Sequence, residues 1–305
     1  MSTPSLRAEQ LQEHSRVKKA SISLDDFVRL ARAPVRPGSY HELPRELEAS
    51  YRTLRMESGR TASVYLKELV QQLAADFRPD ESPLKLPATV RDLYQRELLR
   101  IRAQLETFDL DHYDFDNDPF VKDYALLTHR FIPVGAEFAV PFSGIPRRTL
   151  VQAGFGQFCR AARVVLRAGG FKPYFALHVH PRVLSDFNPQ GWEASYHRLA
   201  ELLQLNPGIK GMISASWFLD PRLKAISPHL AYLRDLPERN GCAFFFVEYD
   251  YAGTSGALAK SATRKRLFRQ GEYIPAIYMR VWWRDDIINW SQRSSASANQ
   301  RSDQE

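Results

Sequence analysis

Two histidines separated by one residue, His178 and His180, are the sharpest chemical feature of the sequence. Side chains alternate along an extended strand, so both imidazoles would project to the same side and could share a cation. The pair ends a β-prone run just before Pro181, and α/β proteins commonly bind ligands at the carboxyl ends of their strands. Imidazole also titrates near neutral pH, so His180 is equally a candidate general base in a polar cleft.

The same pair fits the His-hydrophobic-His pattern of metal-dependent rolling-circle nucleases, a resemblance of three residues. An excess of 42 Lys and Arg over 35 Asp and Glu agrees with a nucleic-acid partner. Such nucleases also use a nucleophilic Tyr on a helix near the metal. Neither Tyr196 nor Tyr232 has the sequence context of that Tyr, and no third metal ligand is evident. We therefore predict no metal and keep the His178/His180 metalloenzyme as an alternative.

A second candidate site precedes a predicted helix at Ser227-Pro228. A Ser at the N-cap and a Pro at the first helical position form a strong helix start, and the free first-turn amides suit an anion. Arg222 and Lys224 lie just upstream and His229 just downstream. These residue types predict a phosphate-binding site made of Arg222, Lys224, Ser227 and His229.

The elements that must position these residues fall into two regions. Between Ser23 and about Leu127 the apolar residues recur at helical spacing, and prolines separate the periodic stretches. We predict a helical region over residues 21–127. Residues 1–20 and 291–305 are polar and lack an apolar anchor, which is typical of disordered tails.

From His129 onward, β-prone runs alternate with helical stretches. We predict strands over 131–142, 174–179, 211–219, 242–249 and 276–283, with helices over 146–168, 192–205, 228–240 and 255–270. A crossover helix is the usual connection between parallel strands. We therefore predict an α/β domain over 128–290, with α+β as the alternative: a mixed sheet with flanking helices that follows an all-helical region.

The order of elements in residues 206–290 resembles the C-terminal half of the GNAT superfamily of acyl-CoA N-acyltransferases. A strand breaks at Asp220-Pro221, and then follow a helix, a strand, a second helix, a Gly-aromatic turn and a last strand. The resemblance is one of pattern over this C-terminal third. It departs from the family where a Gln/Arg-x-x-Gly-x-Gly/Ala pyrophosphate loop is expected, because Leu219-Asp220-Pro221-Arg222-Leu223-Lys224 stands there.

The resemblance implies transfer of an acyl group from coenzyme A or a carrier thioester to an amine on a small-molecule substrate. It places the acyl donor along the strand Ser214–Leu219 and the phosphates at the Ser227 helix. An ammonium has no lone pair with which to attack a thioester, so His180 or Glu248 would remove its proton. The implied co-substrate is an acyl-CoA.

A third class of function is a non-enzymatic binding protein. Trp282, Trp283 and Trp290 would form its contact surface, since Trp is enriched at interface hot spots. The two cysteines and the short apolar runs indicate a cytoplasmic protein without a membrane span. Asp109 to Asp118 lack the Gly and Glu of a calcium-binding loop, and we expect them to form a solvated acidic connector.

Overall fold

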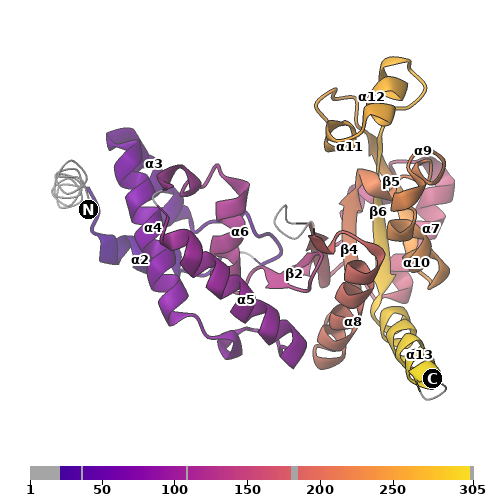
Figure 1. Ribbon diagram of the computed structural model, residues 1–305, viewed down its shortest axis with the longest axis horizontal. Helices are drawn as coiled ribbons and strands as arrows, with labels where there is room; N and C mark the ends of the chain where they lie inside the picture. Colours follow the sequence, from indigo (N-terminus) through magenta and orange to yellow (C-terminus); the bar gives the residue numbers. More distant parts are fainter. Residues whose placement is uncertain (1–20, 36, 108, 180–184, 303–305) are drawn as a thin grey trace. The chain divides into compact units, whose positions relative to one another are not determined.

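The computed structural model describes residues 21–35, 37–107, 109–179 and 185–302 (Figure 1). The predicted N-terminal tail, 1–20, lies outside these residues, as does His180. The chain divides into two compact units, which we call the helical unit (residues 1–83 and 91–132) and the sheet unit (residues 84–90 and 133–305). Each is described by itself.

The helical region has the amphipathic helices that its periodicity predicts. The helices are α2 (Leu24–Ala31), α3 (Arg45–Glu57), α4 (Gly59–Asp76), η1 (Pro79–Glu81), α5 (Ala88–Leu105), η2 (Leu110–His112) and α6 (Asp118–Leu127). Ser23 caps α2 by accepting a hydrogen bond from the Asp26 amide, as a short polar side chain does at a helix start. Phe27, Leu47 and Leu66 are fully buried, so the apolar faces form the core of this unit.

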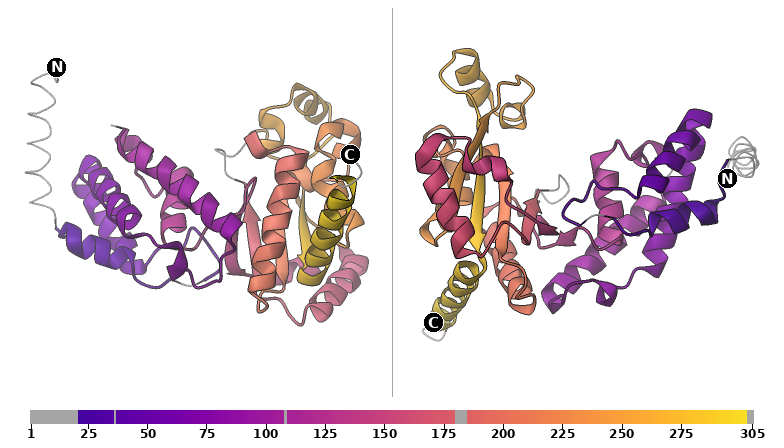
Figure 2. Two further views of the ribbon diagram at one scale, coloured as in Figure 1. Left: turned by 60° about the horizontal axis from the view of Figure 1, so that its bottom comes forward. Right: turned by 180° about the vertical axis from the view of Figure 1, so that it is seen from behind.

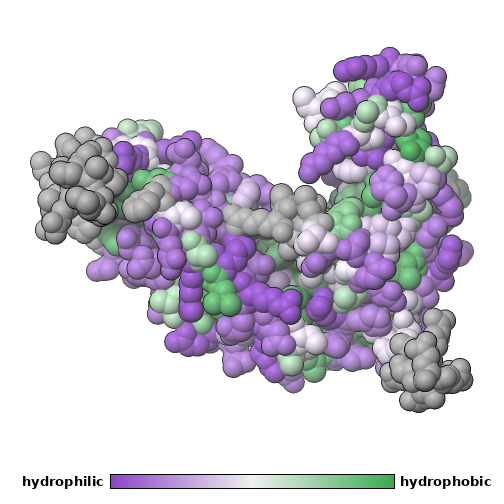
Figure 3. All heavy atoms as spheres, in the orientation of Figure 1, coloured by the Kyte–Doolittle hydropathy of each residue, from purple (hydrophilic) through white to green (hydrophobic). Residues whose placement is uncertain are grey.

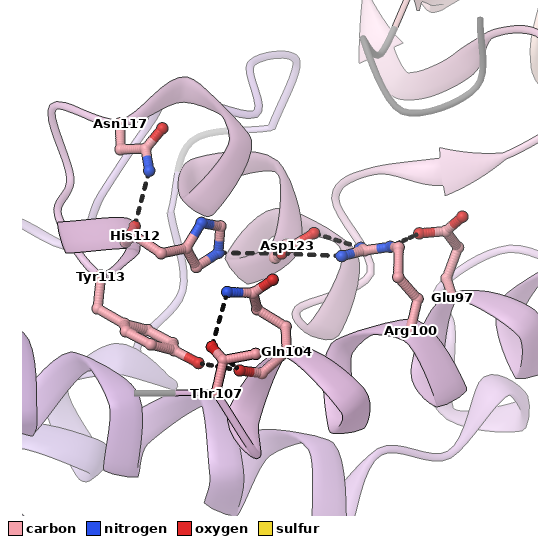
Figure 4. A network of polar contacts seen from close by, with 8 residues as sticks. All are labelled: Glu97, Arg100, Gln104, Thr107, His112, Tyr113, Asn117 and Asp123. Carbon is pink, nitrogen blue, oxygen red and sulfur yellow. Dashed lines mark hydrogen bonds and ion pairs between the residues drawn. The ribbon is translucent and has the colours of Figure 1, made fainter. Parts of the chain in front are cut away.

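A buried polar network crosses the helical unit (Figure 4). The Arg100 guanidinium donates to the Asp123 carboxylate, with Nη1 to Oδ2 at 3.2 Å, and to Glu97 at 2.7 Å. His112 Nε2 lies 3.5 Å from Asp123 Oδ2. Because Asp123 is only 3% exposed, its charge depends on these partners. The network therefore fixes α5 against η2 and α6.

The acidic stretch differs in part from the predicted connector, because three of its carboxylates, Asp114, Asp116 and Asp118, have partners within the helical unit. The Tyr51 hydroxyl donates to Asp114 at 2.7 Å, and the Tyr40 hydroxyl donates to Asp118 at 2.9 Å. Arg55 pairs with both Asp114 and Asp116. The sequence shows a run of acidic residues. It does not show that Tyr40, Tyr51 and Arg55, which lie more than fifty positions earlier, bind them.

The second unit contains the mixed sheet that the alternation of strands and helices predicts. In the described residues the sheet has six strands in the order β1-β2-β3-β4-β6-β5. They are β1 (Ile132–Pro133), β2 (Phe138–Ser143), β3 (Tyr174–His178), β4 (Gly211–Ser216), β5 (Ala243–Tyr249) and β6 (Ala276–Trp283). The flanking helices are η3 (Arg147–Leu150), α7 (Gly154–Arg167), α8 (Pro189–Leu205), η5 (Trp217–Leu219), α9 (Leu223–Ile226), η6 (Pro228–Leu230), α10 (Tyr232–Arg239), α11 (Gly256–Ala259), α12 (Ala262–Arg269) and α13 (Arg284–Ser302). The predicted fold class is confirmed.

Helices cover both faces of the sheet (Figure 2). On one face, Ile213, Phe245 and Val281 pack against Ala161 and Val164 of α7. On the other face, Trp282 meets Tyr196 of α8 edge to face, with ring centroids 5.2 Å apart. Alternation along each strand produces this division, since neighbouring residues project to opposite sides. We call the two sides the α7 face and the α8 face.

The last helix differs from the predicted C-terminal tail. α13 runs over Arg284–Ser302, beyond the predicted boundary at 291. Ile287 and Trp290 are buried, and His197 Nδ1 lies 2.7 Å from Ser291 Oγ. The polar composition after Trp290 does not reveal the apolar anchors just before it, from which the helix extends.

A buried ion pair lies at the centre of the α8 face. Arg280 of β6 is 0% exposed, and both Glu137 carboxylate oxygens accept from its Nη2, at 2.7 and 2.6 Å. Its Nε donates to Ser214 of β4 at 2.6 Å, and its Nη1 donates to the Tyr196 hydroxyl of α8. Burial acts to lower the pKa of Arg280, but the facing carboxylate outweighs burial and raises it. One guanidinium therefore joins two strands, α8 and the segment before β2.

We expect Glu137→Leu to lower the free energy of unfolding by about 3–5 kcal/mol, because Arg280 would remain buried without its counter-charge. The double variant Glu137→Leu/Arg280→Met removes both charges and should recover most of this loss. Urea unfolding measures both. The exposed pair Glu48–Arg52 is the control, and Glu48→Leu should cost about 1 kcal/mol or less. A double variant no more stable than Glu137→Leu would contradict the expectation.

Candidate functional site

The candidate site is the opening between the parallel strands β3 and β4. These strands pair at Phe175 with Met212 and at Ala176 with Ile213, where their parallel register ends. β3 continues to His178 and β4 continues to Ser216. The other registered pairs, β2–β3, β4–β6 and β5–β6, are antiparallel. Among the described residues, no registered pair joins these two central parallel strands toward their carboxyl ends beyond Ala176 and Ile213.

The opening is accessible on the α7 face. Ala215 of β4 is exposed although its strand is central in the sheet, and His178 of β3 is partly exposed. By alternation from Ile213 and Ala176, both side chains project to the α7 face. On the α8 face, Ser214 is buried at 7% exposure and its hydroxyl is bound to Arg280. The ion pair thus closes one side of the opening and leaves the other accessible.

Among the described elements, the helix after β3 is α8, which has 17 residues and begins at Pro189. Asn188 caps it by accepting from the Gly191 amide at 2.9 Å, and Pro189 occupies the first turn. A Cβ at Gly191 would lie 2.2 Å from the Asp186 carbonyl oxygen, so this close approach requires glycine. The helix N-terminus carries a partial positive charge that favours anions.

Aromatic rings join the start of α8 to the end of β4. Trp192 contacts Phe187 and Phe218, with ring centroids 5.6 and 5.8 Å apart. Trp192 is 1% exposed, and its indole N–H has no hydrogen-bond partner among the described residues. A buried donor without a partner costs free energy unless a ligand or water satisfies it. The Arg280 guanidinium lies 5.0 Å from the Trp192 ring centroid, so this ring belongs to the closed α8 face.

The structure describes one of the two predicted bases, Glu248. His180 lies outside them, so its position relative to the opening stays a prediction. Glu248 is exposed at the carboxyl end of β5, on the same face as His178. Three strand spacings separate β3 from β5, which is about 14 Å. Glu248 therefore does not contact His178 directly.

Arg222 and Lys224 each have a carboxylate partner. Arg222 donates to Asp220 through Nε at 3.1 Å and through Nη2 at 2.7 Å, and its guanidinium lies 5.0 Å from the Tyr273 ring centroid. The hydrogen bond to Asp220 raises the pKa of Arg222. Lys224 Nζ lies 3.2 Å from Asp235 Oδ2 and remains largely exposed. These pairings hold both cations within the fold.

Ser227 stands at the N-cap position that the sequence predicts, with Pro228 in the first turn after it. The helix after it, η6, has three residues, and the Ser227 side chain makes no capping hydrogen bond. Its Oγ accepts instead from buried Arg264 Nη1 at 2.8 Å, a partner 37 positions away. His229 is exposed on η6. Phosphate binding by Arg222, Lys224, Ser227 and His229 stays a prediction, and the helix that starts at this site is the three-residue η6.

The Trp surface of the non-enzymatic hypothesis is wrong for two of its three residues. Trp282 is 0% exposed and Trp290 is 5% exposed, because both pack against Tyr196 of α8. For the metal alternative, the described residues contain no group of three or more His, Cys, Asp or Glu side chains that could hold an ion. His178 and His180 stay a prediction, since His180 is not described.

A separate hollow of about 890 Å³ lies in the helical unit. Residues of both charges line it, among them Arg45, Glu46 and Arg52. It contains none of the predicted site residues. Its mixed charge selects no class of ligand.

Two features near the opening were missed in the sequence analysis, the helix start at Asn188-Pro189 and the buried cation Arg280. The Asn188-Pro189 pair carries the same cap-and-proline signal as Ser227-Pro228, and here the structure has a long helix. Arg280 was visible as a lone cation in the apolar strand AIYMRVWW. A cation buried in such a strand requires a carboxylate partner from elsewhere in the fold.

Comparisons with known proteins find structural likeness only. No protein-family model and no curated protein matches the chain. One similar solved structure is an acyltransferase in complex with decanoyl-CoA, with a TM-score of 0.36 and 12% identity over 86% of this chain and 100% of that chain. Another is an acyltransferase in complex with CoA and 10C-Teicoplanin, with a TM-score of 0.36 and 14% identity over 85% of this chain and 93% of that chain.

We expect Arg222→Ala to destabilise the protein by about 1.5–3 kcal/mol, because the buried Asp220 carboxylate loses two charge-assisted hydrogen bonds. Lys224→Ala removes an exposed ion pair and should cost about 1 kcal/mol or less. Thermal unfolding of the two variants beside the parent gives the comparison. Equal stability of Arg222→Ala and Lys224→Ala would show that the Asp220 pairing contributes little.

Proposed function

We propose that this protein is a GNAT-like acyltransferase that moves an acyl group from a coenzyme A thioester to an amine. The observation that carries the proposal is the end of the registered β3–β4 pairing at Ala176 and Ile213 among the described residues, although both strands continue. Strand geometry directs alternate main-chain N–H and C=O groups of Ser214–Ser216 toward the β3 side of the strand. Such groups require partners when they are covered.

An extended ligand with amides suits this opening. A strand edge binds extended chains through main-chain hydrogen bonds, and the pantetheine arm of coenzyme A is a flexible chain with two amides. The exposed Ala215 leaves room beside the strand.

The phosphates of the donor fit the N-terminus of α8 better than η6. α8 has 17 residues and follows β3 in the order of the described elements, so its first turn carries the partial charge of a full helix. A three-residue turn such as η6 has no comparable dipole. Arg222, Lys224, Ser227 and His229 are the second candidate set, and they would act through their side chains.

The reaction requires an uncharged amine. A base removes one proton from the acceptor ammonium, and the nitrogen lone pair then attacks the thioester carbonyl. The C–S bond breaks, the amide forms, and the thiolate leaves as coenzyme A and takes up a proton. His180, which follows β3 in the sequence, and Glu248, at the same end of the sheet as His178, are the proposed bases.

Isothermal titration with acetyl-CoA and longer acyl-CoA donors tests the proposal. We expect binding by the parent protein and at least a tenfold weaker Kd for Ala215→Trp, because the indole would fill the opening. The matched control is Ala49→Trp, at an exposed position on α3, which should bind like the parent. Unfolding curves establish that both variants are folded. No binding of any donor by the parent, or equal binding by Ala215→Trp, would refute the site.

The two phosphate sites are separated by a second pair of variants. If the α8 N-terminus holds the phosphates, Arg222→Ala should keep the affinity of the parent for acyl-CoA at low and high salt. If the second set holds them, Arg222→Ala should weaken binding by about tenfold or more, and this loss should shrink as salt rises. Turnover of His180→Ala and Glu248→Ala at several pH values then identifies the base.

A further inference from the structure

The outward side of α7 has an exposed apolar stripe. Phe155, Phe158 and Leu166 are 79%, 42% and 80% exposed, and their spacing places them on one side of the helix. The two Phe rings stack, with centroids 6.2 Å apart. Large aromatic and aliphatic side chains gathered in this way on a helix surface mark an interaction site.

Two arginines of α7, Arg160 and Arg163, lie beside this stripe. No acidic residue is close to them in the sequence. At 3.6 residues per turn, Arg163 and Arg160 lie about 60° and 120° around the helix from Leu166. Both are exposed, and neither has an ion pair within the described residues. Arg167 is different, because it pairs with Asp286 at 2.8 Å. The sequence between Glu137 and Asp186 has no acidic residue and carries Arg147, Arg148, Arg160, Arg163, Arg167, Lys172 and Arg182.

The opposite side of α7 is fixed to the sheet. Gln157 Nε2 donates to the Phe246 carbonyl at 2.9 Å, and the Phe246 amide donates to Gln157 Oε1 at 2.9 Å. Ala161 and Val164 pack in the core of the α7 face. The helix therefore cannot rotate its apolar stripe inward without leaving β5 main-chain groups unpaired.

We infer that the outward side of α7 docks on an anionic lipid surface. Phe155, Phe158 and Leu166 would enter the boundary between headgroups and acyl chains, while Arg160 and Arg163 would meet the lipid phosphates. The charge argues for this occupant, since the exposed Arg160 and Arg163 beside the stripe complement a uniformly negative surface. Docking differs from spanning, and among the described helices none is long and apolar enough to cross a bilayer.

This surface differs from the other basic region of the sheet unit. α11 and α12 project from one end of the sheet. The part of their surface that is visible in Figure 3 is largely hydrophilic. α12 exposes Lys265, Arg266 and Arg269 without an apolar stripe. It therefore provides a control surface that is basic and has no insertion surface.

Co-sedimentation of the full chain with vesicles tests the inference. We expect binding to phosphatidylcholine vesicles that contain 30% phosphatidylglycerol, and at least tenfold weaker binding to pure phosphatidylcholine. Phe155→Ser/Phe158→Ser should weaken the binding to anionic vesicles at least tenfold, because the inserted area is lost. Leu99→Ser/Met56→Ser, at exposed apolar positions in the helical unit, should bind like the parent.

Charge variants test the second half of the surface. Arg160→Gln/Arg163→Gln should weaken binding about tenfold and flatten its salt dependence. Arg266→Gln/Arg269→Gln removes the same charge from α12 and should have a clearly smaller effect. Equal losses in the two variants would indicate attraction by net charge alone and would overturn the inference.

Cys159 supplies a local readout. It is the exposed cysteine of α7, whereas Cys242 is buried, so a thiol-reactive polarity-sensitive dye reports from beside the stripe. The dye should shift to shorter wavelength with anionic vesicles, and Cys159→Ser should not take up the dye. No shift and no co-sedimentation at low salt would overturn the inference. A parent dimer that Phe155→Ser/Phe158→Ser dissociates would also overturn it, in favour of a second copy of this chain.

Discussion

The sheet unit depends on one buried charge, the Arg280 guanidinium. A buried cation is costly unless it is paired and its remaining donors are bound, so Glu137, Ser214 and Tyr196 must be present together. Ser214 is the first β4 residue beyond the last pairing with β3. Its hydroxyl accepts a hydrogen bond from Arg280 of β6, and β6 neighbours β4 on the side away from β3. The requirement to satisfy the charge thus holds β4 in position at the level where the registered pairing of the two parallel strands ends.

Local patterns were sufficient for several strands of this unit but not for the arrangement of its elements. The predicted strand over 276–283 coincides with β6, and the run over 174–179 differs from β3 by one residue. Alternation of apolar and polar residues, prolines and helix caps are short-range signals, so they determine local structure without distant parts of the chain. The insertion of β6 between β4 and β5 has no local signal, because it depends on which strands bury complementary faces.

The candidate site was less predictable for the same reason. Glu137 and Arg280 are 143 positions apart, and neither has a neighbour that reveals the other. Ser227 and Pro228 have the local chemistry of a helix start, yet the distant Arg264 takes the Ser227 hydroxyl as an acceptor. A cap contributes about 1 kcal/mol, whereas a hydrogen bond to a charged group contributes about 1.5–3 kcal/mol. Tertiary partners of charged groups therefore override local preferences, and they are the part that a sequence pattern does not contain.

The edge of the sheet explains why α7 presents a fixed surface. β5 is an edge strand, and such strands need their free main-chain groups covered. At Phe246 the Gln157 side chain supplies both a donor and an acceptor, in place of a neighbouring strand. Moving α7 outward would expose or orphan these groups, at a cost of about 1–3 kcal/mol for each one left buried and unpaired. The residue that protects the sheet edge therefore also sets the orientation of Phe155 and Phe158, which lie on the other side of the same helix turn.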